Sequence, residues 1–266
     1  ITLRVLNTLR QVDLIAAEDT RHSRILLDHF QITVPLTSYH EHNKYEKAAE
    51  LVVKMQEGTE LALITDAGTP SISDPGEELV RQALAAGIRV TCLPGACAAV
   101  TALAMSGQPA ARFCFEAFLP ADHRERKKIL AELQQETRTI VLYEAPHRLK
   151  KTLAELQETL GDRKLSLCRE LTKQYEEMLP MTLSEACRYY EMQEPRGEYV
   201  LVICGRDPEE LRQMQAAAWQ EMSLSEHLEY YLEQGLDKKT AMKQMALDRG
   251  CTKREIYQGL LSGATR

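Results

Sequence analysis

The chain has 266 residues, 44% of them hydrophobic and 27% charged, which is typical of a soluble globular protein with room for about two domains. No apolar run approaches the roughly 18 residues that a membrane-spanning helix needs, and no secretory signal pattern is present, so we expect a cytoplasmic protein without membrane contact. The formal net charge of −6 excludes a global electrostatic attraction to nucleic acid, so any such binding must depend on local basic patches.

Apolar segments alternate with helical patterns twice along the chain, which predicts an α/β protein. The first set covers residues 1–111, and the second covers residues 112–206. Residues 207–266 contain helical patterns only. We therefore expect two αβα domains with a ligand cleft between them, followed by a small helical extension.

In the first domain, strands are expected where short apolar runs end in polar loops, and helices where apolar residues recur at helical spacing before a glycine. The expected strands cover residues 13–17, 61–65 and 88–93, and the expected helices cover residues 3–9, 21–30, 45–57 and 77–86, with a further helix after Ala98.

The same patterns recur in the second domain. After an apolar segment at 113–119, the expected strands cover residues 139–143, 164–168 and 199–204, and the expected helices cover residues 125–135, 149–160 and about 183–191.

In the tail, the patterns at residues 239–248 and 252–261 predict two helices joined by a turn at Gly250. This resembles a helix-turn-helix, a common nucleic-acid-binding unit. The alternative is a helical cap packed on the second domain or at a dimer contact.

The loop after the 61–65 strand is the centre of the predicted site, because ligands of open α/β sheets bind beyond the carboxyl ends of strands. Gly68 lets another group approach the backbone, and Pro70 stiffens the loop. Asp66 and Asp74 can accept hydroxyl or amino protons. The alternative is an ordinary turn in which the two aspartates cap neighbouring backbone groups.

Two other strand ends in this domain carry candidate residues. Glu18, Asp19 and Arg21 follow the first strand, and Asp19 or Thr20 is expected to cap the next helix. The turn at Pro94 and Gly95 opens a helix of small residues. It offers free helix N–H groups and room for a ligand.

Charged residues also gather at strand ends in the second domain. Glu144 and Arg148 follow one strand, and Arg169, Glu170 and Lys173 follow another. Independent surface ion pairs are one explanation, but two clusters at equivalent strand ends favour a cleft. No GxGxxG, Walker A, GxSxG or HExxH motif is present, which argues against common dinucleotide, nucleoside-triphosphate, serine-hydrolase and zinc-protease chemistry.

Two further polar clusters have competing interpretations. His40 and His42 alternate as metal ligands on a strand do, but no third ligand follows at a telling spacing, so we expect polar groups of a cleft and no metal. Residues 122–128 hold four cations. They form either a solvated helix start or a set of contacts to RNA phosphates.

Several motifs at these strand ends together resemble one family. They are DLIAAEDTR at 13–21, TDAGTP at 65–70 with DPG at 74–76, LPG at 93–95, YE at 143–144 with HR at 147–148, and RELTK at 169–173. In this order they are similar to the bacterial small-subunit ribosomal RNA (cytidine 2′-O)-methyltransferases. That branch belongs to the tetrapyrrole methylase superfamily, the class III S-adenosylmethionine-dependent methyltransferases.

The resemblance implies that S-adenosyl-L-methionine donates a methyl group to the ribose of a cytidine in 16S rRNA of the small ribosomal subunit, and that the enzyme is a homodimer. The donor-binding residues that it implies are Asp66, Ala67, Gly68, Pro94, Gly95, Ala98, Tyr143, Leu171, Gly197 and Val200. Expected catalytic residues are Glu18, Asp19 and Arg21. Expected RNA-binding residues are Arg124, Arg126, Lys127, Arg148 and Lys173.

The start of the chain departs from the family pattern, because family members begin with a strand and a Thr-Pro-Ile-Gly-Asn type loop before the position of Ile1. We expect that this segment is either truncated or disordered, and its loss would leave a sheet edge unpaired. Two other functions stay open: methylation of a small tetrapyrrole, and non-catalytic regulation through a nucleic-acid-binding tail.

Overall fold

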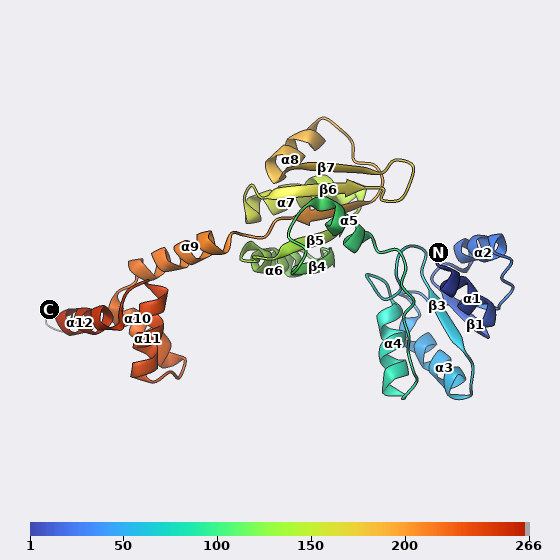
Figure 1. Ribbon diagram of the computed structural model, residues 1–266, viewed down its shortest axis with the longest axis horizontal. Coiled ribbons are helices and arrows are strands. Elements are labelled where there is room, and N and C mark those ends of the chain that lie inside the picture. Colours follow the sequence, from blue (N-terminus) through green and yellow to red (C-terminus); the bar gives the residue numbers. More distant parts are fainter. Residues whose placement is uncertain (264–266) are drawn as a thin grey trace.

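The computed structural model describes residues 1–263, which form two β-sheet units and a series of helices at the carboxyl end (Figure 1). Helices and strands alternate through both sheet units, so the predicted α/β class is confirmed. The first unit lies at the right of Figure 1, the second at its centre, and the tail helices extend to the left. No helix among the described residues is long and apolar enough to cross a membrane.

The first unit is built on a parallel sheet with strand order β2-β1-β3. Its strands are β1 (Leu14–Ala17), β2 (Leu36–Ser38) and β3 (Leu61–Ile64), and its helices are α1 (Leu3–Gln11), α2 (Thr20–His29), α3 (Lys44–Gln56) and α4 (Gly76–Ala85). Successive side chains of a strand point to opposite faces. Ile15 therefore packs with α1 and α2, whereas Ala16 packs with α3 and α4. Helices therefore cover both faces of the sheet, and the first unit has three layers: helices, sheet and helices.

Residues 88–93 do not form the strand predicted for them. No strand within residues 1–263 pairs with this segment, and Val90 is 40% exposed. An apolar run becomes a strand only where a neighbouring strand pairs with its backbone N–H and C=O groups. The sequence shows the apolar run but not whether a partner is present.

The second unit holds a five-stranded mixed sheet with order β4-β5-β8-β6-β7, in which only β4 and β5 are parallel. Its strands are β4 (Phe113–Phe118), β5 (Thr139–Glu144), β6 (Lys164–Arg169), β7 (Glu177–Thr182) and β8 (Tyr199–Ile203). Its helices are α5 (Ala98–Ser106), α6 (His123–Gln134), α7 (Pro146–Leu160) and α8 (Leu183–Glu191).

The two faces of this sheet are covered differently. Leucines of α6, α7 and α8 form the large core on one face. The small residues Ala99 and Ala102 bring α5 against Val141 and Val202 on the other face. Helix α5 therefore packs on the second sheet, although it follows the first unit in sequence.

Strand β7 was not predicted. Its sequence EMLPMT mixes charged, apolar and proline residues, so it lacks the apolar run of a central strand. In the structure β7 pairs with β6 alone and lies at the sheet edge, which is where a strand tolerates a residue such as Pro180 without a backbone N–H.

The tail consists of α9 (Pro208–Glu221), α10 (Leu224–Glu233), α11 (Lys238–Asp248) and α12 (Lys253–Gly263). The two predicted tail helices are confirmed as α11 and α12. They pack on α10 through a small core that includes Met245 and Ile256. Trp219 of α9 stacks on the buried His227 with ring centroids 4.1 Å apart. Burial and the nearby Arg249 hold the pKa of His227 below its ordinary value.

Candidate functional site

The carboxyl ends of β1 and β3 bring Glu18 next to the loop after β3, because Ala17 and Ile64 are paired in the sheet. The Thr65 hydroxyl donates to the Glu18 carboxylate at 3.4 Å. Partial burial, followed by the charges of Asp66 and Asp74, raises the pKa of Glu18. Three carboxylates therefore meet at this edge, and Glu18 binds a proton more tightly than an exposed glutamate does.

The loop itself is held by its own aspartate. Oδ1 of Asp74 accepts from the backbone N–H groups of Ser71 and Gly76, each at 2.8 Å. For this oxygen, the alternative that Asp74 caps neighbouring backbone groups is thus confirmed. Oδ2 of Asp74 and Nδ1 of His40 are buried and have no hydrogen-bond partner among the described residues.

Asp19 caps α2, which resolves the choice left open by the sequence. Its Oδ1 accepts from the Arg21 backbone N–H at 2.8 Å, and its Oδ2 lies 3.0 Å from the Arg21 guanidinium. These bonds lower the pKa of Asp19 to about 2. A carboxylate of such low basicity is a poor proton acceptor.

An open groove of about 520 Å³ lies beside this cap, between α2 and β2. Its lining residues are Thr20, Arg21, Arg24, Leu36, Thr37 and Ser38. Arg24 was missed in the sequence, although its i, i+3 spacing from Arg21 places both cations on one helix face. The groove thus combines two guanidinium groups with hydroxyl groups, a combination suited to phosphate oxygens.

The glycine-rich loops expected to bind the donor contact one another. The Thr69 hydroxyl donates to the Ala96 carbonyl at 2.8 Å, and a Cβ on Gly68 would lie 3.8 Å from the same oxygen. A Cβ on Gly95 would meet no atom within 4 Å. The backbone at Gly95 is therefore open to a ligand.

Four other expected donor residues form one apolar cluster on the second sheet: Ala98, Tyr143, Leu171 and Val200. The Tyr143 hydroxyl accepts from the backbone N–H of Ala99 at 3.1 Å and so fixes the start of α5. Burial raises the pKa of Tyr143, so the phenol stays protonated.

Gly197, another expected donor residue, has φ of +76°, and a Cβ there would be 2.4 Å from Cγ of Glu170. The Glu170 carboxylate accepts from the Glu198 backbone N–H at 2.8 Å and from Lys173 at 3.1 Å. Lys173 is also bound to the Glu198 carboxylate at 2.8 Å. Its ammonium group is thus neutralised by two glutamates.

The expected RNA-binding cations differ in exposure. Arg124 and Lys127 are exposed on α6. Arg126 is 5% exposed, and its guanidinium binds Glu155 at 2.6 Å and the Thr152 hydroxyl at 2.7 Å. The prediction of an RNA contact is wrong for Arg126, because a cation inside a charged run was assumed to face solvent although its helix position turns it inward.

Arg148 is also largely engaged within the second unit. It donates to the Leu119 carbonyl and lies 3.3 Å from the buried Glu144 carboxylate. Its proposed contact with RNA thus has to compete with these two partners.

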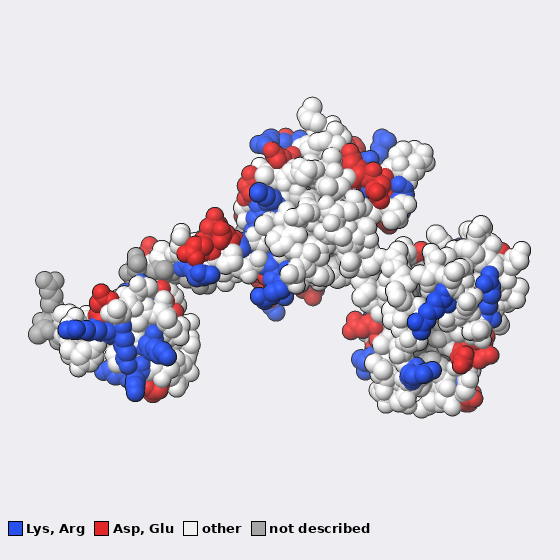
Figure 2. Space-filling model, viewed as in Figure 1, with Lys and Arg blue, Asp and Glu red and all other residues white. Residues whose placement is uncertain are grey.

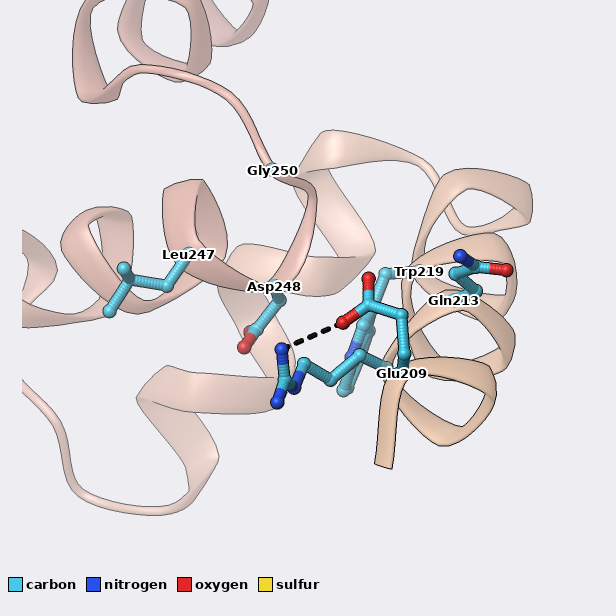
Figure 3. A pocket seen from close by; sticks show the side chains of 7 residues that line it. Glu209, Gln213, Trp219, Leu247, Asp248 and Gly250 are labelled. Carbon is cyan, nitrogen blue, oxygen red and sulfur yellow. Dashed lines mark hydrogen bonds and ion pairs between the residues drawn. The ribbon is translucent and has the colours of Figure 1, made fainter. Parts of the chain in front are cut away.

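A separate pocket of about 320 Å³ lies between α9 and α11 in the tail (Figure 3). Trp219, Leu247 and Asp248 line it together with Glu209, whose carboxylate pairs with Arg212 at 2.8 Å. None of the residues expected at the site lines this pocket.

Comparison with known proteins adds an independent line of evidence. The sequence model of Tetrapyrrole (Corrin/Porphyrin) Methylases matches residues 1–187. A Synechocystis protein named ribosomal RNA small subunit methyltransferase I is 46% identical over 259 residues, which cover 97% of this chain and 91% of that protein. A Thermotoga maritima protein of the same name is 42% identical over 207 residues, which cover 78% of this chain and 93% of that protein.

Among solved structures, the methyltransferase CobJ is 20% identical to this chain, with a TM-score of 0.58. The superposition covers 77% of this chain and 88% of CobJ. At this level of identity the likeness concerns the fold alone.

Proposed function

Because the chain belongs to the tetrapyrrole methylase family, we propose that it uses S-adenosyl-L-methionine to methylate the ribose 2′-hydroxyl of a cytidine in 16S rRNA. The family predicted from the sequence motifs is thereby confirmed. The observation that carries the proposal is the 46% identity, over 97% of the chain, to a relative named for methylation of small-subunit ribosomal RNA. The cytidine and the 2′-oxygen come from the motif resemblance alone.

The residues present fit a bound methyl donor. Space is open at the Gly95 backbone, and the N-cap Cys97 of α5 makes no side-chain capping bond. The Ala99 N–H donates to Tyr143, but the other N–H groups of the first turn can face a polar ligand. We assign donor binding to Asp66, Ala67, Gly68, Pro94, Gly95, Ala98, Tyr143, Leu171, Gly197 and Val200. When bound, the donor supplies an activated methyl group.

The acceptor must be aligned and activated by the chain itself. A ribose hydroxyl is weakly acidic, so a nearby base raises its nucleophilicity. Glu18 suits this role better than Asp19, because the pKa of Glu18 is raised whereas that of Asp19 is about 2. Arg21 and Arg24 suit the orientation of RNA phosphates, because both line the groove beside α2.

We also propose that the enzyme is a homodimer whose chain divides into residues 1–111, 112–206 and 207–266. Two domains that meet at the donor site, and a separate tail, match the family resemblance. Sedimentation of the protein in solution tests the dimer.

The function is tested with labelled S-adenosylmethionine, small ribosomal subunits that lack the modification, and a tetrapyrrole precursor in a parallel reaction. We expect label in the RNA, recovered as an alkali-resistant dinucleotide because 2′-O-methylation blocks cleavage. Label only in the tetrapyrrole would identify a small-molecule methyltransferase. Label in neither, with RNA binding retained, would favour the non-catalytic regulator.

Replacing Gly95 by Ala tests the donor site separately. The added methyl group meets no protein atom within 4 Å, so we expect an unchanged melting temperature. It occupies space assigned to the donor, so we expect about tenfold weaker binding of S-adenosylmethionine, measured by calorimetry. The control Gly87→Ala also adds a methyl group in open space, outside the site but at a backbone φ of +74°, so we expect its melting temperature to fall while its donor affinity stays that of the wild type. Equal donor affinity in both variants would remove Gly95 from the assignment.

A further inference from the structure

Between residues 237 and 263, every acidic side chain is bonded within the tail itself. Asp237 caps α11 by accepting from the N–H groups of Lys239 and Thr240 at 2.9 and 3.0 Å. Glu226 completes the capping box of α10, and Glu255 accepts from the Thr252 N–H at 2.7 Å. Asp248 binds the Tyr231 hydroxyl at 2.5 Å. These carboxylates therefore satisfy helix ends and a phenol instead of pairing with the tail lysines.

Five cations of the tail make no ion pair with a carboxylate of the described residues. They are Lys238, Lys239 and Lys243 of α11, and Lys253 and Arg254 in the first turn of α12. Within residues 1–263, none of them lies within 4.0 Å of a carboxylate. Figure 2 shows Lys and Arg side chains gathered on the tail, at the left of the view. We call these five residues the tail basic face.

Two other tail arginines have different roles: Arg212 of α9 pairs with Glu209, and Arg249 packs inside the tail. Arg249 donates to Nδ1 of His227 at 3.0 Å and also to the carbonyl of Met222. It is therefore part of the packing of α10 against α11. This contrast separates a structural arginine from five cations whose charge no ion pair in the tail neutralises.

The position of the tail basic face suits a nucleic acid. Helices α11 and α12 are joined by a tight turn in which Gly250 has φ of +63° and Cys251 N–H donates to the Ala246 carbonyl at 2.9 Å. In helix-turn-helix proteins the start of the second helix contacts the nucleic acid. Lys253 and Arg254 occupy that position.

The tail is also distinct from the methyltransferase core. It lies beyond residues 1–187, which the family model matches. The Thermotoga maritima relative is aligned over 93% of its own length but over only 78% of this chain, so part of this chain has no counterpart in that alignment.

We propose that the tail basic face binds phosphates of the RNA substrate and holds the RNA at a second point outside the methyl-transfer site. The inference rests on the proposed function for the identity of the RNA. The major groove of an RNA duplex is too narrow for side chains to read its bases. The contacts are therefore to phosphates, and binding depends on charge and salt but little on sequence.

The test is a full-length variant with Lys239→Gln, Lys243→Gln and Arg254→Gln. The matched control is Lys47→Gln, Lys54→Gln and Arg81→Gln, which removes the same charge from α3 and α4, where these cations pair with glutamates. Affinity for 16S rRNA is measured at several salt concentrations, and kcat and KM for methylation are measured in parallel. Circular dichroism confirms that each variant is folded.

We expect the slope of log affinity against log salt to fall by about 2 in the tail variant, with about 10- to 100-fold weaker binding at 0.1 M salt. KM should rise while kcat stays unchanged. An RNA affinity and salt slope equal to those of the control would overturn the inference. If the wild type binds RNA through the tail but does not methylate it, the proposed function fails while the tail basic face stands.

Discussion

Replacing Glu18 by Gln is expected to lower kcat for RNA methylation by about 10²- to 10⁴-fold, the range of a lost general base. Gln keeps the shape of the side chain and still accepts from the Thr65 hydroxyl, but it cannot take a proton. Glu18 sits at the end of β1, where partial burial and two neighbouring carboxylates raise its pKa. Initial rates with saturating donor and unmodified small subunits give the measurement.

The pH dependence provides a second readout of the same residue. A base must be ionised, so the rate of the wild type rises with pH through the pKa of Glu18, which is above its ordinary value of 4.5. The acid limb of the rate profile should therefore lie above that value in the wild type. It should disappear in the Glu18→Gln variant.

Asp19→Asn is the matched control for this substitution. Asn caps a helix about as well as Asp, so α2 keeps its start. The pKa of Asp19 is already about 2, and its oxygens are bound to Arg21 and the helix backbone. We expect less than a tenfold loss of kcat. Arg21→Ala should act mainly on KM. Wild-type turnover in all three variants would show that this strand end takes no part in the chemistry.

The sequence predicted most of the fold because its signals are local. Asp122 and Thr182 cap α6 and α8 through side-chain oxygens, and the helices begin where those residues stand. Strands β5 and β8 are apolar over nearly their whole length because both of their faces are covered. Such signals need no knowledge of distant residues.

The errors come from features that depend on a partner. Residues 88–93 were predicted as a strand, but no strand among the described residues pairs with them. Strand β7 was not predicted, because it lies at the sheet edge and its sequence contains no apolar run. Arg126 lies in a charged run, but Glu155 and Thr152 of α7 hold it in the protein. No sequence pattern near Arg126 indicates that contact, because its two partners lie in another helix, 26 and 29 residues further along the chain.

The candidate site was partly predictable for a physical reason. The carboxyl ends of parallel strands share one sheet edge, so the loops after β1 and β3 had to meet. The sequence pattern could not show whether Glu18 or Asp19 is the better base. The capping bonds lower the pKa of Asp19, whereas partial burial raises the pKa of Glu18. Only the structure shows which residue has which environment.

Replacing Gly205 by Ala is expected to destabilise the second unit by about 3 kcal/mol, through a steric clash with backbone atoms. A Cβ on this glycine would lie 2.1 Å from the Thr137 carbonyl oxygen and 2.6 Å from that of Arg138. The flanking residues are held in place, because Cys204 N–H donates to the Lys164 carbonyl at 2.9 Å and Arg206 N–H donates to the Glu136 carbonyl at 2.8 Å. Thermal and urea unfolding followed by circular dichroism give the change.

Gly107→Ala separates this clash from backbone strain. Gly107 ends α5, which packs on the second sheet, in the left-handed conformation with φ of +68°, and a Cβ there meets nothing within 4 Å. This conformation alone costs Ala about 1 kcal/mol. Gly205→Ala should therefore lower the stability of the second unit clearly more than Gly107→Ala. If Gly107→Ala is the more destabilising change, the backbone around Thr137 must be able to shift and make room for a side chain at position 205.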